Sequence, residues 1–99
     1  MTSPGNGLLY DVKLSNQIKE TIKELHGRLA HQSKGQQFLD SLRAIYNRLR
    51  QDPTTFGEPL YRLPALKLLV YQVVVSGIVV YYGVHEEEPL VFLKGVQLL

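Results

Sequence analysis

The sequence has no cysteine among its 99 residues. This absence excludes a disulfide scaffold, a thiol nucleophile and a zinc–thiolate site. It is typical of a cytoplasmic protein, and we expect that location. The common phosphate-loop, dinucleotide-binding, nucleophile-elbow and zinc-protease motifs are also missing, so we expect no cofactor.

A strong excess of one charge is missing as well. Eleven Lys and Arg residues stand against nine Asp and Glu, which gives a net charge of +2. A protein that binds nucleic acid tightly usually carries a denser set of cations. The charge balance therefore does not favour a dedicated nucleic-acid binder.

No segment has the features of an export signal or a membrane helix. The first seven residues, MTSPGNG, contain neither a basic region nor an apolar one. The single long apolar run, residues 68–84, is interrupted by Gln72, Ser76 and Gly77 and is rich in β-branched residues. It predicts two buried strands joined by a turn, without membrane association.

The chain is predicted to hold an N-terminal arm, residues 1–7, and one domain, residues 8–99. Residues 8–14 alternate between apolar and polar side chains, which indicates a strand. Ser15 then has the place of an N-cap. Four apolar residues follow at spacings of four, three and four, as expected of a helix: Ile18, Ile22, Leu25 and Leu29.

A second helix is predicted to begin near residue 34. Ser33 and Gln36 have the spacing of a capping box, and Asp52-Pro53 ends the helical pattern. The predicted apolar face consists of Phe38, Leu42, Ile45 and Leu49, widened by Leu39 and Tyr46. Two helices joined by so short a link are expected to form an antiparallel hairpin.

The C-terminal third predicts three strands, at residues 66–75, 78–85 and 90–98. A short extended piece at residues 60–63 precedes them. A two-residue turn at Ser76-Gly77 would place Tyr71 opposite Tyr82, Leu68 opposite His85, Gln72 opposite Tyr81 and Lys67 opposite Glu86. Gly95 is the predicted position of a bulge.

This order of elements resembles the RelE/ParE toxin superfamily. Two stretches carry the resemblance, LRAIYNRLRQDPTTFGEPLYRLP and LKLLVYQVVVSGIVVYYGV. They resemble the family's helix end with its proline-bearing link, and its apolar hairpin. The resemblance covers residues 8–98 and implies an α+β fold of order β-α-α-β-β-β, in which a helical hairpin packs on a small antiparallel sheet.

The resemblance also implies a function. RelE-type members cut messenger RNA on the ribosome, ParE-type members inhibit DNA gyrase, and both are normally neutralised by an antitoxin. The family's sheet arginine falls at Leu66-Lys67, so only Lys67 keeps the charge, and glutamates fill residues 86–88. We therefore expect a bacterial toxin–antitoxin protein that acts by protein binding, with weak or absent ribonuclease activity.

Four residues are candidates for a catalytic set: Lys67, His85, Tyr82 and Arg62. Cleavage of RNA needs a base, an acid and a cation that stabilises the developing phosphate charge. The predicted register, however, places Lys67 and His85 on opposite faces of the sheet. A Lys67–Glu86 ion pair across the strands is the alternative, and a ribosome-dependent endoribonuclease stays open as an alternative function.

The helices carry a predicted basic patch of Lys19, Lys23, Arg43 and Arg50. It suits nucleic acid or an acidic partner, or it is an ordinary solvated helix surface. The acidic run at residues 85–88 predicts a solvated turn rather than a metal site, because neighbouring strand residues diverge.

The strands at residues 68–75 and 78–84 are apolar on both faces, whereas two helices cover one face. This predicts a partner, a homodimer or an antitoxin-like protein, at Leu69, Tyr71, Val73, Val80 and Tyr82. A curved sheet that covers itself is the alternative. A non-toxic module that dimerises through this face is a further alternative function.

Overall fold

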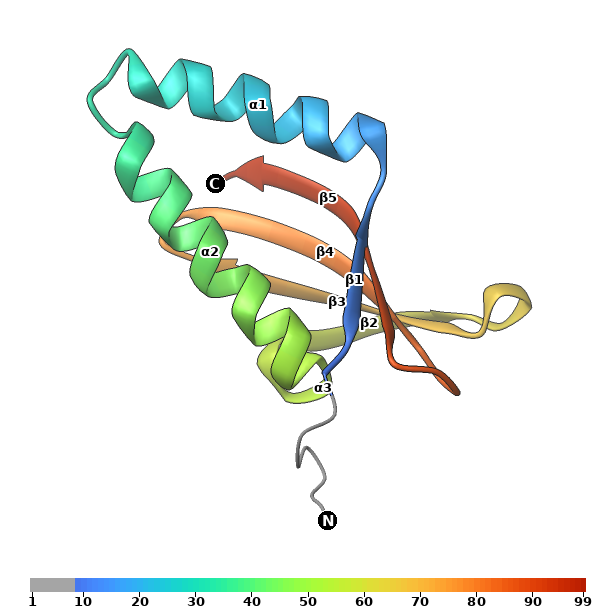
Figure 1. Cartoon of the computed structure of the whole chain (residues 1–99). Helices are drawn as coiled ribbons and strands as arrows, with labels where there is room; N and C mark the ends of the chain where they lie inside the picture. The colour runs from blue at the N-terminus through green and yellow to red at the C-terminus, as the bar shows by residue number, and fades with distance from the viewer. Residues whose placement is uncertain (1–8) are drawn as a thin grey trace.

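The computed structural model describes residues 9–99, so the predicted arm lies outside the described residues. The fold is α+β (Figure 1), as predicted. The elements are β1 (Asp11–Leu14), α1 (Asn16–Ala30), α2 (Gly35–Gln51), α3 (Pro53–Phe56), β2 (Glu58–Leu63), the 3₁₀ turn η1 (Pro64–Leu66), β3 (Leu68–Val75), β4 (Ile78–His85) and β5 (Leu90–Leu98).

The sheet has five strands in the order β1-β5-β4-β3-β2. β1 pairs in parallel with β5, and the other neighbours are antiparallel. The prediction of a small antiparallel sheet is therefore corrected to a mixed sheet. The sequence places β1 as a strand but does not give its direction relative to β5, because the two are more than seventy residues apart.

β2 is a complete strand of six residues and not the four-residue piece that the sequence predicted. Pro59 cannot donate to a ladder, which argued against a longer strand. The structure places β2 at the edge of the sheet, where proline is tolerated, and the register shifts between Pro59 and Tyr61.

The first helix forms as the sequence predicts. The Ser15 side chain accepts a hydrogen bond from the Ile18 N–H at 3.2 Å, which satisfies one of the free donors of the first turn. Ile18 and Leu25 are buried, and Ile22 and Leu29 pack against the same core.

The second helix begins at the predicted place but without the predicted capping box. Ser33 has a φ of 59°, a left-handed conformation in the link between the helices, and Lys34 occupies the N-cap position without a side-chain bond. The Gln36 amide donates instead to the Asp40 carboxylate at 2.9 Å. The tight link required by the hairpin thus overrides the local capping pattern.

The β3–β4 hairpin has the predicted register, with Tyr71 opposite Tyr82 and Leu68 opposite His85. Ser76 and Gly77 both have positive φ, of 51° and 79°, which is the geometry of a tight two-residue turn. The predicted bulge at Gly95 is confirmed by the register shift between β4 and β5. β3 starts two residues later than predicted, because residues 64–66 form η1.

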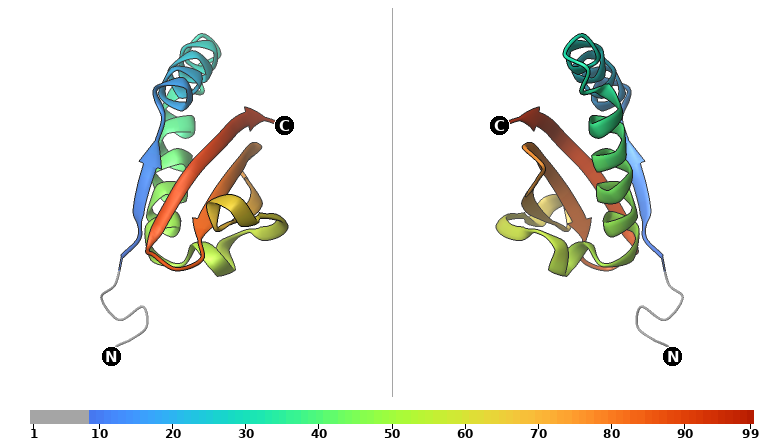
Figure 2. Two further views of the ribbon diagram at one scale, coloured as in Figure 1. Left: turned by 90° about the vertical axis from the view of Figure 1, so that its right-hand side faces the viewer. Right: turned by 90° about the vertical axis from the view of Figure 1, so that its left-hand side faces the viewer.

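Both long helices lie on the same side of a curved sheet, as Figure 2 shows from two directions. The core between them includes Phe38, Ile45 and Leu49 of α2 and Val80 and Tyr82 of β4. The helical stripes predicted from the sequence are therefore the core-facing stripes.

The five predicted partner-interface residues lie on this covered side, which corrects the prediction that they form an open surface. Tyr71, Val80 and Tyr82 are buried in the core, and Leu69 and Val73 pack against it. Alternation along a strand fixes which side chains share a face, but the sequence alone does not tell which of two apolar faces the helices cover.

The opposite face of the sheet is also partly closed. Leu68, Val70 and Val79 alternate with the core residues and are 5%, 0% and 3% exposed. These three side chains are therefore shielded from solvent within the single chain. Tyr61 and Val74 stay about half exposed on that face, so its apolar surface is smaller than the sequence predicts.

Candidate functional site

The predicted catalytic residues Lys67, His85 and Arg62 gather at one end of the sheet, where the β4–β5 turn meets the end of β2. Arg62 forms a bidentate ion pair with Glu86. The Lys67 ammonium lies 3.2 Å from both carboxylate oxygens of Glu87. The predicted Lys67–Glu86 pair is therefore replaced by two pairs, although the Glu86 N–H does donate to the Lys67 carbonyl.

The backbone conformation of Lys67 sets the direction of its side chain. Its φ of 55° is left-handed, because η1 ends there and β3 begins at the next residue. Lys67 therefore has no place in the alternation of β3, and the predicted separation of Lys67 and His85 onto opposite faces does not apply.

His85 holds the acidic turn in shape. Its Nδ1 accepts hydrogen bonds from the N–H groups of Glu87 and Glu88, both at 3.1 Å. Because Nδ1 accepts, a neutral His85 carries its proton on Nε2. His85 therefore has a structural role in the turn that presents the glutamates to Arg62 and Lys67.

The electrostatics of this end of the sheet do not suit a phosphate group. The guanidinium of Arg62 donates to Glu86 and lowers the pKa of that carboxyl group. Both cations are thus paired with carboxylate groups, and the Glu88 side chain follows directly in the same turn. An RNA phosphate would have to displace these carboxylates and would be repelled by them.

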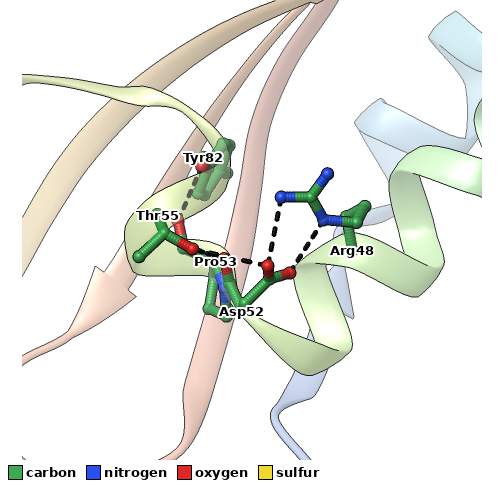
Figure 3. A network of polar contacts seen from close by, with 5 residues as sticks. All are labelled: Arg48, Asp52, Pro53, Thr55 and Tyr82. Atoms are coloured by element: carbon green, nitrogen blue, oxygen red, sulfur yellow. Dashed lines mark hydrogen bonds and ion pairs between the residues drawn. The ribbon is translucent and has the colours of Figure 1, made fainter.

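Tyr82, the fourth candidate, makes its contacts outside this cluster. Its side chain is fully buried. Its hydroxyl donates to the Pro53 carbonyl at 2.8 Å (Figure 3), and its ring stacks on Tyr71 with centroids 5.3 Å apart. Burial raises the pKa of Tyr82 to about 12. A buried, neutral hydroxyl that is already bonded serves to anchor α3 to the sheet, not to transfer protons.

Arg48 and Asp52 complete the network beside Tyr82, as Figure 3 shows. Arg48 Nε lies 2.9 Å from Asp52 Oδ1, and the guanidinium carbon is 4.5 Å from the Phe56 ring centre. Thr55 donates to the Asp52 carbonyl. Sequence reasoning missed this junction, although the four-residue spacing of Arg48 and Asp52 would have indicated the pair.

A second candidate site is a pocket between α1 and α2, away from the link that joins the two helices. Here an apolar pocket of about 120 Å³ is enclosed by the two helices, β1 and the sheet. Its lining residues are Val12, Leu14, Ile22, Leu42, Ile45, Tyr46, Leu49, Val80, Leu93 and Val96. We call it the hairpin pocket. Tyr46, which is 42% exposed, connects it to the surface.

The four residues of the predicted basic patch do not line the hairpin pocket, but helical spacing relates them to residues near it. Arg43 and Arg50 lie three before and four after Tyr46 on α2, and the Arg50 guanidinium is 5.8 Å from the Tyr46 ring. Lys19 and Lys23 lie seven and three residues before His26, so they share its side of α1.

That side of α1 faces α2, since His26 stacks on Phe38. Among the described residues only Arg43 of the four cations has an ion pair, with Asp40 at 3.6 Å. Helical spacing therefore places the four cations on the sides of α1 and α2 next to the pocket lining, and we call them its rim. The sequence alone could not show this, because it depends on how the two helices pack.

No group of three His, Asp or Glu side chains among residues 9–99 is placed to hold a metal ion. None of the helices in this range has the length and apolar character needed to cross a bilayer.

Comparison with protein-family models, with curated proteins and with solved structures finds no match for this chain.

Proposed function

We propose that this chain is a RelE/ParE-like protein of the bacterial toxin–antitoxin type that acts by binding a protein, with weak or absent ribonuclease activity. The observation that carries the proposal is the contrast between two sites. The cations of the candidate catalytic cluster are occupied by Glu86 and Glu87, whereas the hairpin pocket combines an apolar floor with largely unpaired cations.

The hairpin pocket suits an amphipathic, acidic segment of a partner protein. Apolar anchors of such a segment would contact Ile22, Leu42 and Leu14, and its carboxylates would meet the rim. Charge complementarity of this kind steers association and determines which partner binds, more than it adds raw affinity. We take the partner to be the cellular target, and an antitoxin-like protein is the alternative.

The resemblance to RelE/ParE proteins supports the toxin–antitoxin part of the proposal. The strand, helical hairpin and antiparallel strands in the structure are compatible with the β-α-α-β-β-β order that the resemblance implies, with an additional β2 strand.

Controlled expression of the chain alone in a bacterial host tests the proposal. We expect growth arrest while total messenger RNA, followed by primer extension, stays intact. Normal growth would contradict the toxin type. Arrest with messenger RNA cut in a ribosome-dependent manner would replace the proposal with the ribonuclease alternative.

The dimerising module is distinguished by light scattering of the purified chain. Because Leu68, Val70 and Val79 are already buried in one chain, we expect a monomer. A stable dimer together with normal growth would favour the non-toxic interaction module.

A further inference from the structure

The C-terminal half of β5 lacks a neighbouring strand on one side. β1 pairs with β5 from Leu90 to Leu93 and ends there, whereas β5 continues to Leu98. On its other side β5 pairs with β4 along this stretch. Residues 94–98, about 16 Å of strand, therefore present backbone N–H and C=O groups at an unpaired edge.

A groove runs along this same stretch. It has a volume of about 410 Å³ and is lined on one side by the consecutive residues 92–97 of β5. Consecutive residues line a cavity together only when the strand presents its edge, because the side chains alternate between faces. Ser15, the N-cap of α1, and Gln17, Ile18 and Thr21 of its first two turns form the other wall. We call it the β5 groove.

The β5 groove is electropositive. Lys94 is exposed in its wall, and no Asp or Glu lines it. The first turn of α1 contains no acidic residue either, so the positive end of the helix is not neutralised by its own side chains. Carboxylates placed in this groove would be stabilised by both groups.

We propose that the β5 groove binds an extended acidic segment of a partner protein, which adds to the sheet as a strand beside residues 94–98. Main-chain hydrogen bonds to the open edge supply affinity, as in other cases of strand addition. Acidic side chains next to Lys94 and the start of α1 supply specificity. This site is separate from the hairpin pocket and does not depend on the toxin-type activity.

A second copy of the chain fits this edge poorly. Residues 94–98 contain no carboxylate, so a second copy paired on this edge would offer no partner charge to Lys94, and the bulge beside Gly95 interrupts the flat edge that such pairing requires. The edge is thus protected against self-association but open to an acidic strand.

The test is a nuclear magnetic resonance titration of the full isotope-labelled chain. The probe is the synthetic peptide acetyl-Thr-Val-Glu-Val-Glu-Val-Thr-amide. We expect saturable shifts, and slower hydrogen exchange, at the amides of residues 94–97, with smaller shifts at Gln17 and Thr21. The same peptide methylated at its central valine nitrogen cannot donate and is expected to bind about ten-fold more weakly.

The variant Lys94→Glu gives a reciprocal prediction. It should weaken binding of the acidic peptide about ten-fold and strengthen binding of a peptide with lysine in place of glutamate. Because one affinity rises, misfolding cannot produce this result. Arg28→Glu, which makes the same charge change away from the linings of both the β5 groove and the hairpin pocket, should leave both affinities unchanged.

Four results would overturn the proposal. They are no binding at millimolar peptide, equal binding of the methylated peptide, shifts centred on the hairpin pocket, and shifts at residues 94–97 that follow protein concentration without peptide. The last of these would assign the edge to a second copy of the chain.

Discussion

At the scale of single residues, Tyr82 connects α3 to the sheet. It is fully buried, and its hydroxyl satisfies the Pro53 carbonyl. We expect Tyr82→Phe to lower the free energy of unfolding by about 1–2 kcal/mol, because it leaves a buried acceptor without a donor. Urea unfolding at pH 7 measures this loss, and an unchanged midpoint would contradict the anchoring role.

The raised pKa of Tyr82 predicts a pH dependence. The folded chain keeps the phenol proton up to about pH 12, whereas an unfolded tyrosine loses it near its ordinary pKa of 10.0. Stability is therefore unaffected by this group below pH 10 and falls between pH 10 and pH 12, by up to about 2 kcal/mol. The difference in unfolding free energy between wild type and Tyr82→Phe should shrink over that range, and a constant difference would contradict it.

Two glycines are expected to respond in opposite ways to alanine. A Cβ at Gly57 would lie 2.7 Å from both the Gln72 carbonyl oxygen and the Tyr82 hydroxyl, so Gly57→Ala should cost about 2 kcal/mol. Gly27 is exposed in mid-helix with nothing near its Cβ position, and Gly27→Ala should gain about 1 kcal/mol. Thermal unfolding of both variants tests this, and a loss in both would show that α1 needs Gly27.

At the scale of elements, Ser15 and Ser33 both precede a helix, but only Ser15 caps one with its side chain. Ser15→Ala should cost about 1 kcal/mol because it removes the hydrogen bond to Ile18 N–H. Ser33→Ala should be nearly neutral, since α2 has no side-chain cap bond. Chemical unfolding of the pair tests this contrast, and equal losses would restore the predicted capping box.

Most elements could be predicted because local patterns determine them. The α1 stripe, the Ser76-Gly77 turn with its register, and the β5 bounds depend on spacing within a few residues. The local predictions that were wrong concern residues whose conformation depends on the packing of distant parts of the chain. The hairpin link moved Ser33 into a left-handed conformation, and the edge position made Pro59 acceptable within β2.

At the scale of the whole molecule, the sequence identified the charged residues but not how they are arranged. It named Arg62, Lys67 and His85 together, and the structure brings them to one end of the sheet. It could not show that Glu86 and Glu87 pair with the two cations, because the left-handed turn at Lys67 shifts the expected pairing. It also placed the five predicted interface residues on an open face, whereas the helices cover that face, because both faces of the sheet are apolar and the pattern does not tell them apart.

The central claim is that the chain acts by binding a protein at the hairpin pocket and not through the Arg62–Lys67–His85 cluster. Two double variants separate these surfaces. Lys23→Glu with Arg43→Glu reverses charge on the pocket rim, and Lys67→Ala with His85→Ala removes the candidate catalytic groups. Arg28→Glu with Lys34→Glu is the matched control, because it makes the same charge change away from the pocket lining.

The decisive measurement is the growth rate of a bacterial host that expresses each folded variant at equal level. We predict that the wild type, the control and the Lys67/His85 variant all arrest growth, and that the Lys23/Arg43 variant does not. Arrest that survives the pocket variant but is lost in the Lys67/His85 variant would contradict the account and identify the cluster as the active surface.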